Sequence, residues 1–180
     1  MLHRLPVTPH ARPRAAARTA ASVEAGGAAL IEVLGYQLAC ASVLTTAVFA
    51  RAVGEPLDLR PVEYTILALL RENPELTPAR LARRLAVTAP NITAWLTRLE
   101  QRGLLKRSTS PSDRRVQVLG LTAAGRRAAR EGTQRLIDAE AVALASLSRG
   151  EFMLLKELLR KVAAVAGLDT AAAAGLPGRG

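Results

Sequence analysis

The feature that most constrains the fold is a pair of short helical segments, each with its own start signal, separated by a tight turn. The first segment starts at Thr77 with Pro78 behind it, and the second starts at Thr88 with Pro90 in its first turn. Gly103 ends the second segment. Apolar residues at helical spacing give each segment one side to bury: Leu81, Leu85, Ile92, Leu96 and Leu99. Two short capped helices this close together predict a helix-turn-helix.

A predicted β-hairpin follows these helices directly. Residues 104–107 and 116–121 are strand-like on either side of a turn that contains Pro and Ser. A lone hairpin is marginally stable and its tip adds little core, so the tip, with Asp113, Arg114 and Arg115, must act outside the fold. An arginine there can enter the DNA minor groove after a carboxylate has oriented it, while the adjacent helix occupies the major groove. The other interpretation is a solvated turn with an incidental ion pair.

A helix-turn-helix followed directly by a hairpin is a winged helix. Longer helical patterns flank it on both sides. Thr122 and Ser148 are suited to start two helices after it. Before it, an apolar stripe runs at helical spacing through Leu30, Leu34, Leu38, Ala41, Thr45 and Val48. This is more apolar surface than one small domain covers, so we expect a dimer that pools it. The expected fold class is mostly α: a winged helix-turn-helix with a two-stranded β wing, whose N- and C-terminal helices form a dimerisation region.

Composition divides the chain into five expected segments. A disordered basic extension covers residues 1–25, and a disordered tail of low complexity covers 168–180. Between them we expect an N-terminal dimerisation helix (26–54), a winged helix-turn-helix DNA-binding lobe (55–122) and C-terminal helices that complete the dimer interface (123–167). A transit peptide has a composition similar to that of the basic extension, but the disordered extension is the interpretation we prefer.

The charge of the chain points to an anionic partner. The formal net charge is +10, and residues 57–130 alone hold fourteen basic and six acidic residues. An anionic membrane is the alternative partner, since Val33 to Ala50 is uncharged and near the minimum length for spanning. That stretch is diluted by small and polar residues and is bounded by Glu32 and Arg51. We therefore expect it to be covered by a partner subunit, with no membrane as partner.

Composition also argues against several kinds of site. Cys40 is the only cysteine, so the chain has no internal disulfide and a reducing compartment, the cytoplasm, is expected. Both histidines, His3 and His10, lie in the N-terminal extension, which leaves the body without the usual residues for a zinc site or a histidine-dependent triad. No catalytic residue, metal or cofactor is predicted, and the chain is not expected to be an enzyme.

From Leu34 to about Arg130 the chain resembles the MarR family of bacterial transcriptional regulators. The motifs that carry this resemblance are Leu34-Gly35-Tyr36, Leu81-Ala82-Arg83-Arg84-Leu85, Leu99-Glu100-Gln101-Arg102-Gly103-Leu104, and Asp113-Arg114-Arg115 followed by Leu121-Thr122-Ala123-Ala124-Gly125. The resemblance implies a homodimer with interlocked terminal helices and two winged-helix lobes. It also implies binding to a pseudo-palindromic double-stranded DNA operator, usually to repress transcription, in the bacterial nucleoid.

The resemblance also assigns roles to individual residues. Asp113 would orient the wing, Arg115 would probe the minor groove and Arg114 would lie close to phosphate. At the start of the second helix Pro90, Asn91 and Ala94 would face bases, and Thr88, Thr93 and Arg98 would lie near the DNA backbone. The Asn91 amide can pair bidentately with adenine, so it is the best candidate for direct readout.

Two residues depart from the family pattern. Ala94 stands where many relatives carry arginine, so one polar base contact is missing or replaced. Trp95 stands where an aliphatic residue is usual. We interpret Trp95 as a partly buried core residue in preference to a DNA contact.

Many family members release DNA when a small aromatic or phenolic effector binds. Tyr36 and Tyr64 are candidates to line such a pocket, and core packing explains them equally well. Relatives that sense peroxide carry a cysteine one position before an aromatic residue, where this chain has Gly35 before Tyr36. Cys40 lies five residues further on, in an apolar setting, and we interpret it as a buried structural thiol in preference to a sensor.

One alternative function stays open at this point. A winged helix can also serve sequence-indifferent architectural DNA binding or protein interaction. The specificity ratio and the salt dependence of binding separate that function from operator binding.

Overall fold

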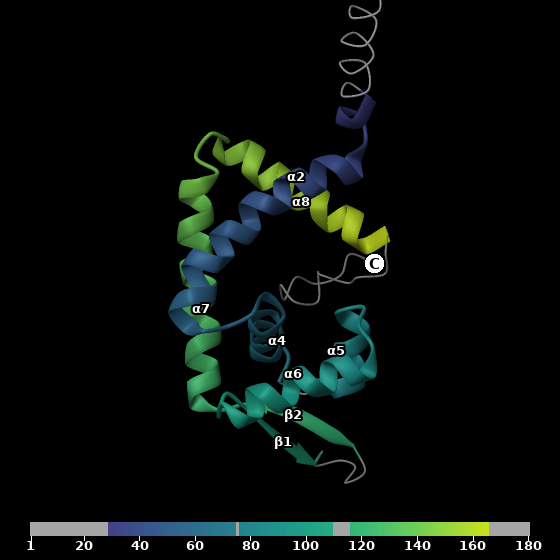
Figure 1. Cartoon of the computed structure of the whole chain (residues 1–180), viewed down its shortest axis with the longest axis vertical. Coiled ribbons are helices and arrows are strands. Elements are labelled where there is room, and N and C mark those ends of the chain that lie inside the picture. Colours follow the sequence, from purple (N-terminus) through teal and green to yellow (C-terminus); the bar gives the residue numbers. More distant parts are fainter. Residues whose placement is uncertain (1–28, 75, 110–115, 166–180) are drawn as a thin grey trace, which may run out of the picture. The chain divides into compact units, whose positions relative to one another are not determined.

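A computed structural model of the chain describes residues 29–74, 76–109 and 116–165. The chain divides into two units, residues 1–43 and 44–180. The described elements are helices apart from one two-stranded antiparallel sheet, in agreement with the expected fold class (Figure 1).

Helix α2, Leu34–Phe49, begins in the first unit and continues into the second. None of its residues is buried, and large side chains such as Leu34 and Leu44 are exposed. A π-helical turn, η1 (Ala50–Gly54), and the short helix α3 (Glu55–Leu57) continue its path. Pro56 is tolerated here because it lies in the first turn of α3, where a missing N–H costs little. By length and composition alone, Leu34–Leu57 would suffice to cross a membrane.

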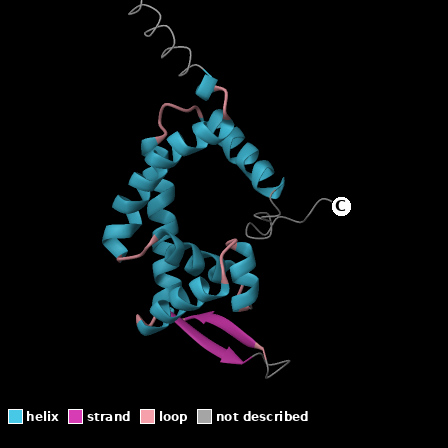
Figure 2. Ribbon diagram, turned by 45° about the vertical axis from the view of Figure 1, so that its right-hand side comes forward, coloured by secondary structure: helices cyan, strands magenta, loops and turns pink. Residues whose placement is uncertain are grey.

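The winged helix-turn-helix is built from α4 (Pro61–Glu72), α5 (Pro78–Arg84), α6 (Ala89–Gln101), β1 (Leu105–Thr109) and β2 (Gln117–Leu121). The strands pair with Leu105 opposite Leu121 and Thr109 opposite Gln117, and Figure 2 shows them projecting beyond the helices. Every helix of the lobe and one strand contribute fully buried side chains to its core: Ile66, Leu67, Leu81, Ile92, Leu96, Leu99 and Leu119. The predicted helix-turn-helix and hairpin are therefore confirmed.

Three of the four predicted helix caps form as expected. Thr77 Oγ1 accepts the Arg80 N–H at 3.3 Å, and Thr122 Oγ1 accepts the Gly125 N–H at 3.0 Å. Ser148 and Glu151 cap each other reciprocally, and the Ser148 hydroxyl and N–H hold the pKa of Glu151 below its ordinary value.

The fourth cap, at Thr88, has the predicted position but lacks the predicted hydrogen bond. Thr88 is the N-cap residue of α6, with extended backbone angles, but its side chain makes no capping hydrogen bond. Pro90 occupies the second helical position, and its ring nitrogen has no proton to donate to Thr88. At the other end of α6, Gly103 has φ +67°, and the Leu104 N–H donates to the Leu99 carbonyl at 3.0 Å. The predicted stop at Gly103 is therefore confirmed.

Helix α7, Ala123–Ala143, packs its first half against the lobe, where its small residues Gly125, Ala129 and Gly132 are buried. A Cβ added at Gly125 would lie 1.9 Å from the Leu104 carbonyl oxygen, so no larger residue fits there. Helix α8, Arg149–Val165, has no buried residue. One group of large apolar side chains on α8 is exposed: Met153, Leu154, Leu155, Leu158, Leu159 and Val162.

Candidate nucleic-acid interface

The first turns of α6 present an exposed surface. Five of the residues predicted to meet DNA lie there and are all exposed: Thr88, Pro90, Asn91, Thr93 and Ala94. On the opposite side of the same helix, Ile92, Leu96 and Leu99 are buried in the lobe core. The structure therefore brings these five residues together at one end of one helix.

The direction of α6 suits this surface to a polyanion. An α-helix carries partial positive charge at its N-terminus, where the first N–H groups have no partner within the helix. The Thr88 side chain makes no capping hydrogen bond to these N–H groups. Phosphate oxygens are the ligands that such a helix end attracts, so the first turns of α6 can contact a DNA backbone while Asn91 reaches base edges.

The wing is tied to α6 by a contact that the sequence did not reveal. Arg107 on β1 places its Nε 3.1 Å from Glu100 Oε2, and its Nη2 donates to Thr97 Oγ1 at 3.2 Å. Glu100 and Thr97 both belong to α6. The hairpin is thus fixed to the helix at its base, while the predicted wing residues Asp113, Arg114 and Arg115 lie outside the described residues.

A buried carboxylate holds the other end of α6, and this too was missed. Glu63, in the first turn of α4, is fully buried, and its Oε1 lies 3.0 Å from Arg98 Nε. Its Oε2 accepts the Arg60 N–H at 2.9 Å and lies 3.8 Å from Arg102 Nη1. A glutamate three positions into a helix is an ordinary capping residue, so its burial could not be predicted from the sequence. Arg98, predicted to lie near the DNA backbone, is therefore already engaged by a protein carboxylate.

Trp95 lies on α6, partly buried and packed against the lobe core. This confirms its interpretation as a core residue. As the only tryptophan of the chain, it reports on the environment of α6.

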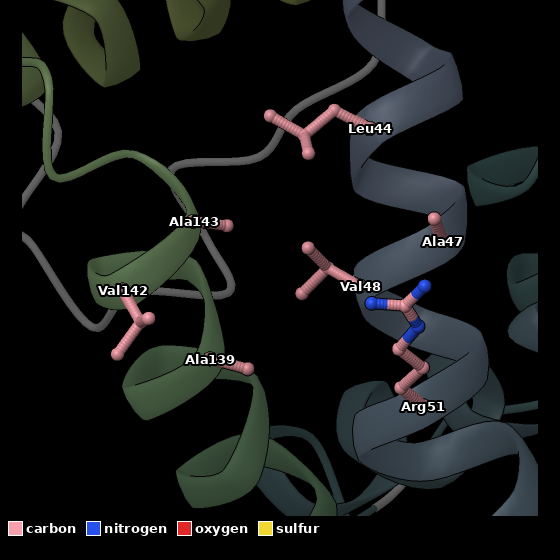
Figure 3. A pocket seen from close by; sticks show the side chains of 7 residues that line it. All are labelled: Leu44, Ala47, Val48, Arg51, Ala139, Val142 and Ala143. Atoms are coloured by element: carbon pink, nitrogen blue, oxygen red, sulfur yellow. The ribbon is translucent and has the colours of Figure 1, made fainter.

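A mostly apolar pocket of about 440 Å³ lies between α2 and α7, within the second unit. It is lined by Leu44, Ala47, Val48, Arg51, Ala139, Val142 and Ala143. Figure 3 shows Leu44 and Val48 projecting from α2 toward α7, with the Arg51 guanidinium beside Val48. The pocket thus combines small apolar walls with one cation, a pattern suited to an apolar molecule that carries a negative charge.

The two tyrosines considered for an effector pocket have other contacts. The Tyr64 ring packs 5.8 Å from the Phe49 ring, and its hydroxyl donates to Thr133 Oγ1 at 3.0 Å, since the Thr133 hydroxyl itself donates to the Ala129 carbonyl. Tyr36 lies in the first unit, and a hydrogen bond with Cys40 raises the pKa of its phenol. Cys40 is exposed, which differs from the buried thiol that the sequence suggested. The effector role of both tyrosines stays a prediction.

Residues suited to hold a metal ion do not gather in the described ranges. Within 29–74, 76–109 and 116–165, no group of three or more His, Cys, Asp or Glu side chains has the arrangement of a metal site.

The chain is similar in sequence and structure to several known proteins. The MarR family model matches residues 59–116. A putative transcriptional regulatory protein for the hcr operon of Thauera aromatica is 30% identical over 129 residues, which span 72% of this chain and 78% of that protein. The transcriptional repressor CouR, solved bound to a 23-mer DNA duplex, is 33% identical with a TM-score of 0.68, over 74% of this chain and 94% of CouR. PcaV of Streptomyces coelicolor, solved in complex with its natural ligand, is 26% identical with a TM-score of 0.65, over 76% of this chain and 96% of PcaV.

Proposed function

The chain belongs to the MarR family of transcriptional regulators, and from this premise we propose that it is a homodimeric repressor that binds a pseudo-palindromic operator. In this proposal α6 enters the major groove and the wing arginine Arg115 enters the minor groove, after Asp113 has oriented it. The protein acts on DNA in the bacterial cytoplasm. The observation that carries the proposal is the exposed surface at the start of α6, centred on Asn91.

We assign the DNA contacts by their place on α6 and on the wing. Asn91 pairs with adenine, and Pro90 and Ala94 contact base edges beside it. Thr88 and Thr93 lie on the flanks and contact phosphate, as does Arg114 on the wing. CouR, which shares the fold, is bound to a DNA duplex in its solved structure, and this likeness supports the assignment.

The dimer is proposed from the exposed apolar surface of α2 and α8. Neither helix has a buried residue, although both carry large apolar side chains. Large exposed apolar patches mark protein interfaces, and two-fold symmetric dimers are the commonest solution. A second copy of this chain therefore covers these helices, which also accounts for the apolar length of Leu34–Leu57 without a membrane.

The pocket between α2 and α7 is the proposed effector site. Its apolar walls suit an aromatic or phenolic ring, and Arg51 suits a carboxylate on that ring. PcaV, which has a similar fold, has a crystal structure in complex with its natural ligand. Because α2 leads through η1 and α3 into the winged lobe, a ligand here is placed to change the position of α6.

Selection of bound sequences from a random duplex pool, at two salt concentrations, tests the proposed function. We expect a two-fold symmetric motif with half-sites about one helical turn apart, retained at the higher salt. Binding that yields no motif and weakens evenly with salt would instead support a sequence-indifferent DNA-binding module.

A further inference from the structure

Glu63 is the one fully buried charged residue of the described chain, and the lobe core surrounds it. A carboxylate loses its hydration on burial and is stable there only when cations and N–H donors replace the water. The cations beside Glu63 come from α6 and its C-cap residue: Arg98 Nε lies 3.0 Å from Oε1, and Arg102 Nη1 lies 3.8 Å from Oε2. The Arg60 N–H supplies the remaining donor, at 2.9 Å from Oε2. The carboxylate therefore joins the start of α4 to the last two turns of α6.

Arg102 extends this connection to the turn that precedes α4. Its Nη2 lies 3.3 Å from the Asp58 carboxylate and donates to the Leu57 carbonyl at 3.3 Å, and its Nη1 donates to the Asp58 carbonyl. Asp58 has φ +47°, in the left-handed region that residues other than glycine rarely adopt, so the backbone turns sharply here. The C-terminal half of α6 is thus bound both to α4 and to the end of the helical path from α2.

Arg98 is the residue whose role this network changes. Glu63 Oε1 accepts no hydrogen bond, so its contact with Arg98 Nε is an ion pair. Removal of either partner would leave the other without its nearest opposite charge. The Arg98 side chain is 39% exposed, which also leaves a phosphate contact open to it. Charge pairing within the lobe and phosphate contact predict different results on mutation.

We propose that Glu63 is a positioning residue for operator recognition, which acts through Arg98 and Arg102 without touching DNA. The two ion pairs fix the rotation of α6 about its own axis and its position along that axis relative to α4. They therefore fix where Asn91, Thr93 and Ala94 point at the other end of the same helix. Base readout needs side chains held in one geometry, whereas contact with phosphate tolerates small rotations. This inference rests on the proposed function of the chain as an operator-binding regulator.

A double-mutant cycle on the full chain tests the proposal. Glu63→Gln, Arg98→Gln and the double variant are titrated against a duplex selected by the wild-type protein and against a scrambled duplex of the same length. We expect each single variant to lose about tenfold in affinity for the selected duplex. The double variant should lose no more than Glu63→Gln, because Glu63→Gln already breaks the pair that Arg98→Gln removes. Affinity for the scrambled duplex and the salt slope stay at wild-type values.

Two controls keep the result interpretable. Glu72→Gln removes an exposed carboxylate at the far end of α4 and should leave both affinities unchanged. Trp95 fluorescence and thermal unfolding show whether each variant is folded. If Glu63→Gln does not fold, Arg102→Gln takes its place, and a several-fold loss confined to the selected duplex is expected.

The contrary results are distinct. Additive losses in the double variant, or equal losses on both duplexes, would overturn the positioning role. A salt slope that falls by about one in Arg98→Gln, with Glu63→Gln unchanged, would make Arg98 a phosphate contact. Failure of the wild-type protein to select any motif would overturn the proposed function itself, before any variant is made.

Discussion

Gly125 shows how a single residue sets the approach of two elements. Its Cα lies so close to the turn after α6 that an added Cβ would meet the Leu104 carbonyl carbon at 2.9 Å and its oxygen at 1.9 Å. Both are backbone atoms, so neither can move aside by a change of rotamer. Gly132 is a milder case, since its added Cβ would meet side-chain atoms, those of the Tyr64 ring, at 3.0 Å.

Gly125→Ala is therefore expected to destabilise the fold by about 1–3 kcal/mol or more, the usual cost of inserting a methyl group into a filled space. Gly150→Ala is the matched control, because a Cβ at this helical glycine meets nothing within 4 Å. That change should stabilise α8 by up to about 1 kcal/mol. Thermal or urea unfolding of both variants measures the difference, and equal stability of the two would contradict the packing described here.

At the wing, Arg115→Ala should lower operator affinity by about 1–3 kcal/mol while the protein stays folded and dimeric. Arg114→Ala, one residue away, should weaken binding to all sequences about equally, because a phosphate contact carries no sequence information. Fluorescence anisotropy with the selected and the scrambled duplex separates the two effects. Unchanged binding by Arg115→Ala would remove the wing from the mechanism.

At the scale of elements, the ends of the helices are where local sequence and observed structure agree best. Thr77, Thr122 and Ser148 each cap the helix that they were predicted to start. A cap depends on a few neighbouring residues, so it can be predicted from the sequence. Thr88 is the exception: its side chain makes no capping hydrogen bond at the start of the helix that we propose to enter DNA.

Thr122→Ala and Thr88→Ala should consequently behave as opposites. Thr122→Ala removes the acceptor for the Gly125 N–H and should cost about 1 kcal/mol of folding stability. Thr88→Ala removes no capping bond and should leave stability almost unchanged while it weakens DNA binding. Unfolding curves and DNA titrations on the same two proteins provide the comparison. A stability loss in Thr88→Ala equal to that in Thr122→Ala would show that its hydroxyl does cap α6.

The contacts between elements could not be predicted from the sequence. Glu63 and Arg98 are 35 positions apart along the chain, and nothing near either of them indicates that they meet in the core. The Arg107 contact with Glu100 crosses from the wing to α6 in the same way. Helix start signals and apolar periodicity describe single elements, whereas these pairs depend on how α4, α6 and β1 pack. The exposed face of α6 was predictable because the 3.6-residue period of its buried face fixes which residues remain outside.

For the molecule as a whole, binding to the proposed two-fold operator requires a second copy of the chain. A basic winged lobe alone reaches one half-site, and a pseudo-palindromic operator needs two lobes held at a fixed spacing. The exposed apolar side chains of α8 are available to provide that link. In this proposal the basic surface of the lobe contacts DNA, and the exposed apolar surface of α8 holds the dimer together.

Leu158→Asp should shift the protein from dimer to monomer, because it places a carboxylate in the proposed apolar interface. Operator binding should fall with it, since two half-sites are no longer engaged together. Lys161→Ala, a change at a charged and 69% exposed side chain of the same helix, is the control and should stay dimeric. Analytical ultracentrifugation gives the masses, and a dimeric Leu158→Asp protein would exclude this face of α8 from the interface.

Sequence selection repeated with Asn91→Ala beside the wild-type protein shows whether α6 reads bases. If the first turns of α6 read bases, the variant should select the same symmetric motif with the preference for adenine lost at one position in each half-site. Its affinity for the wild-type operator should fall by about 1–3 kcal/mol. An identical motif from both proteins, with the adenine preference intact, would contradict the claim that Asn91 on α6 reads the operator.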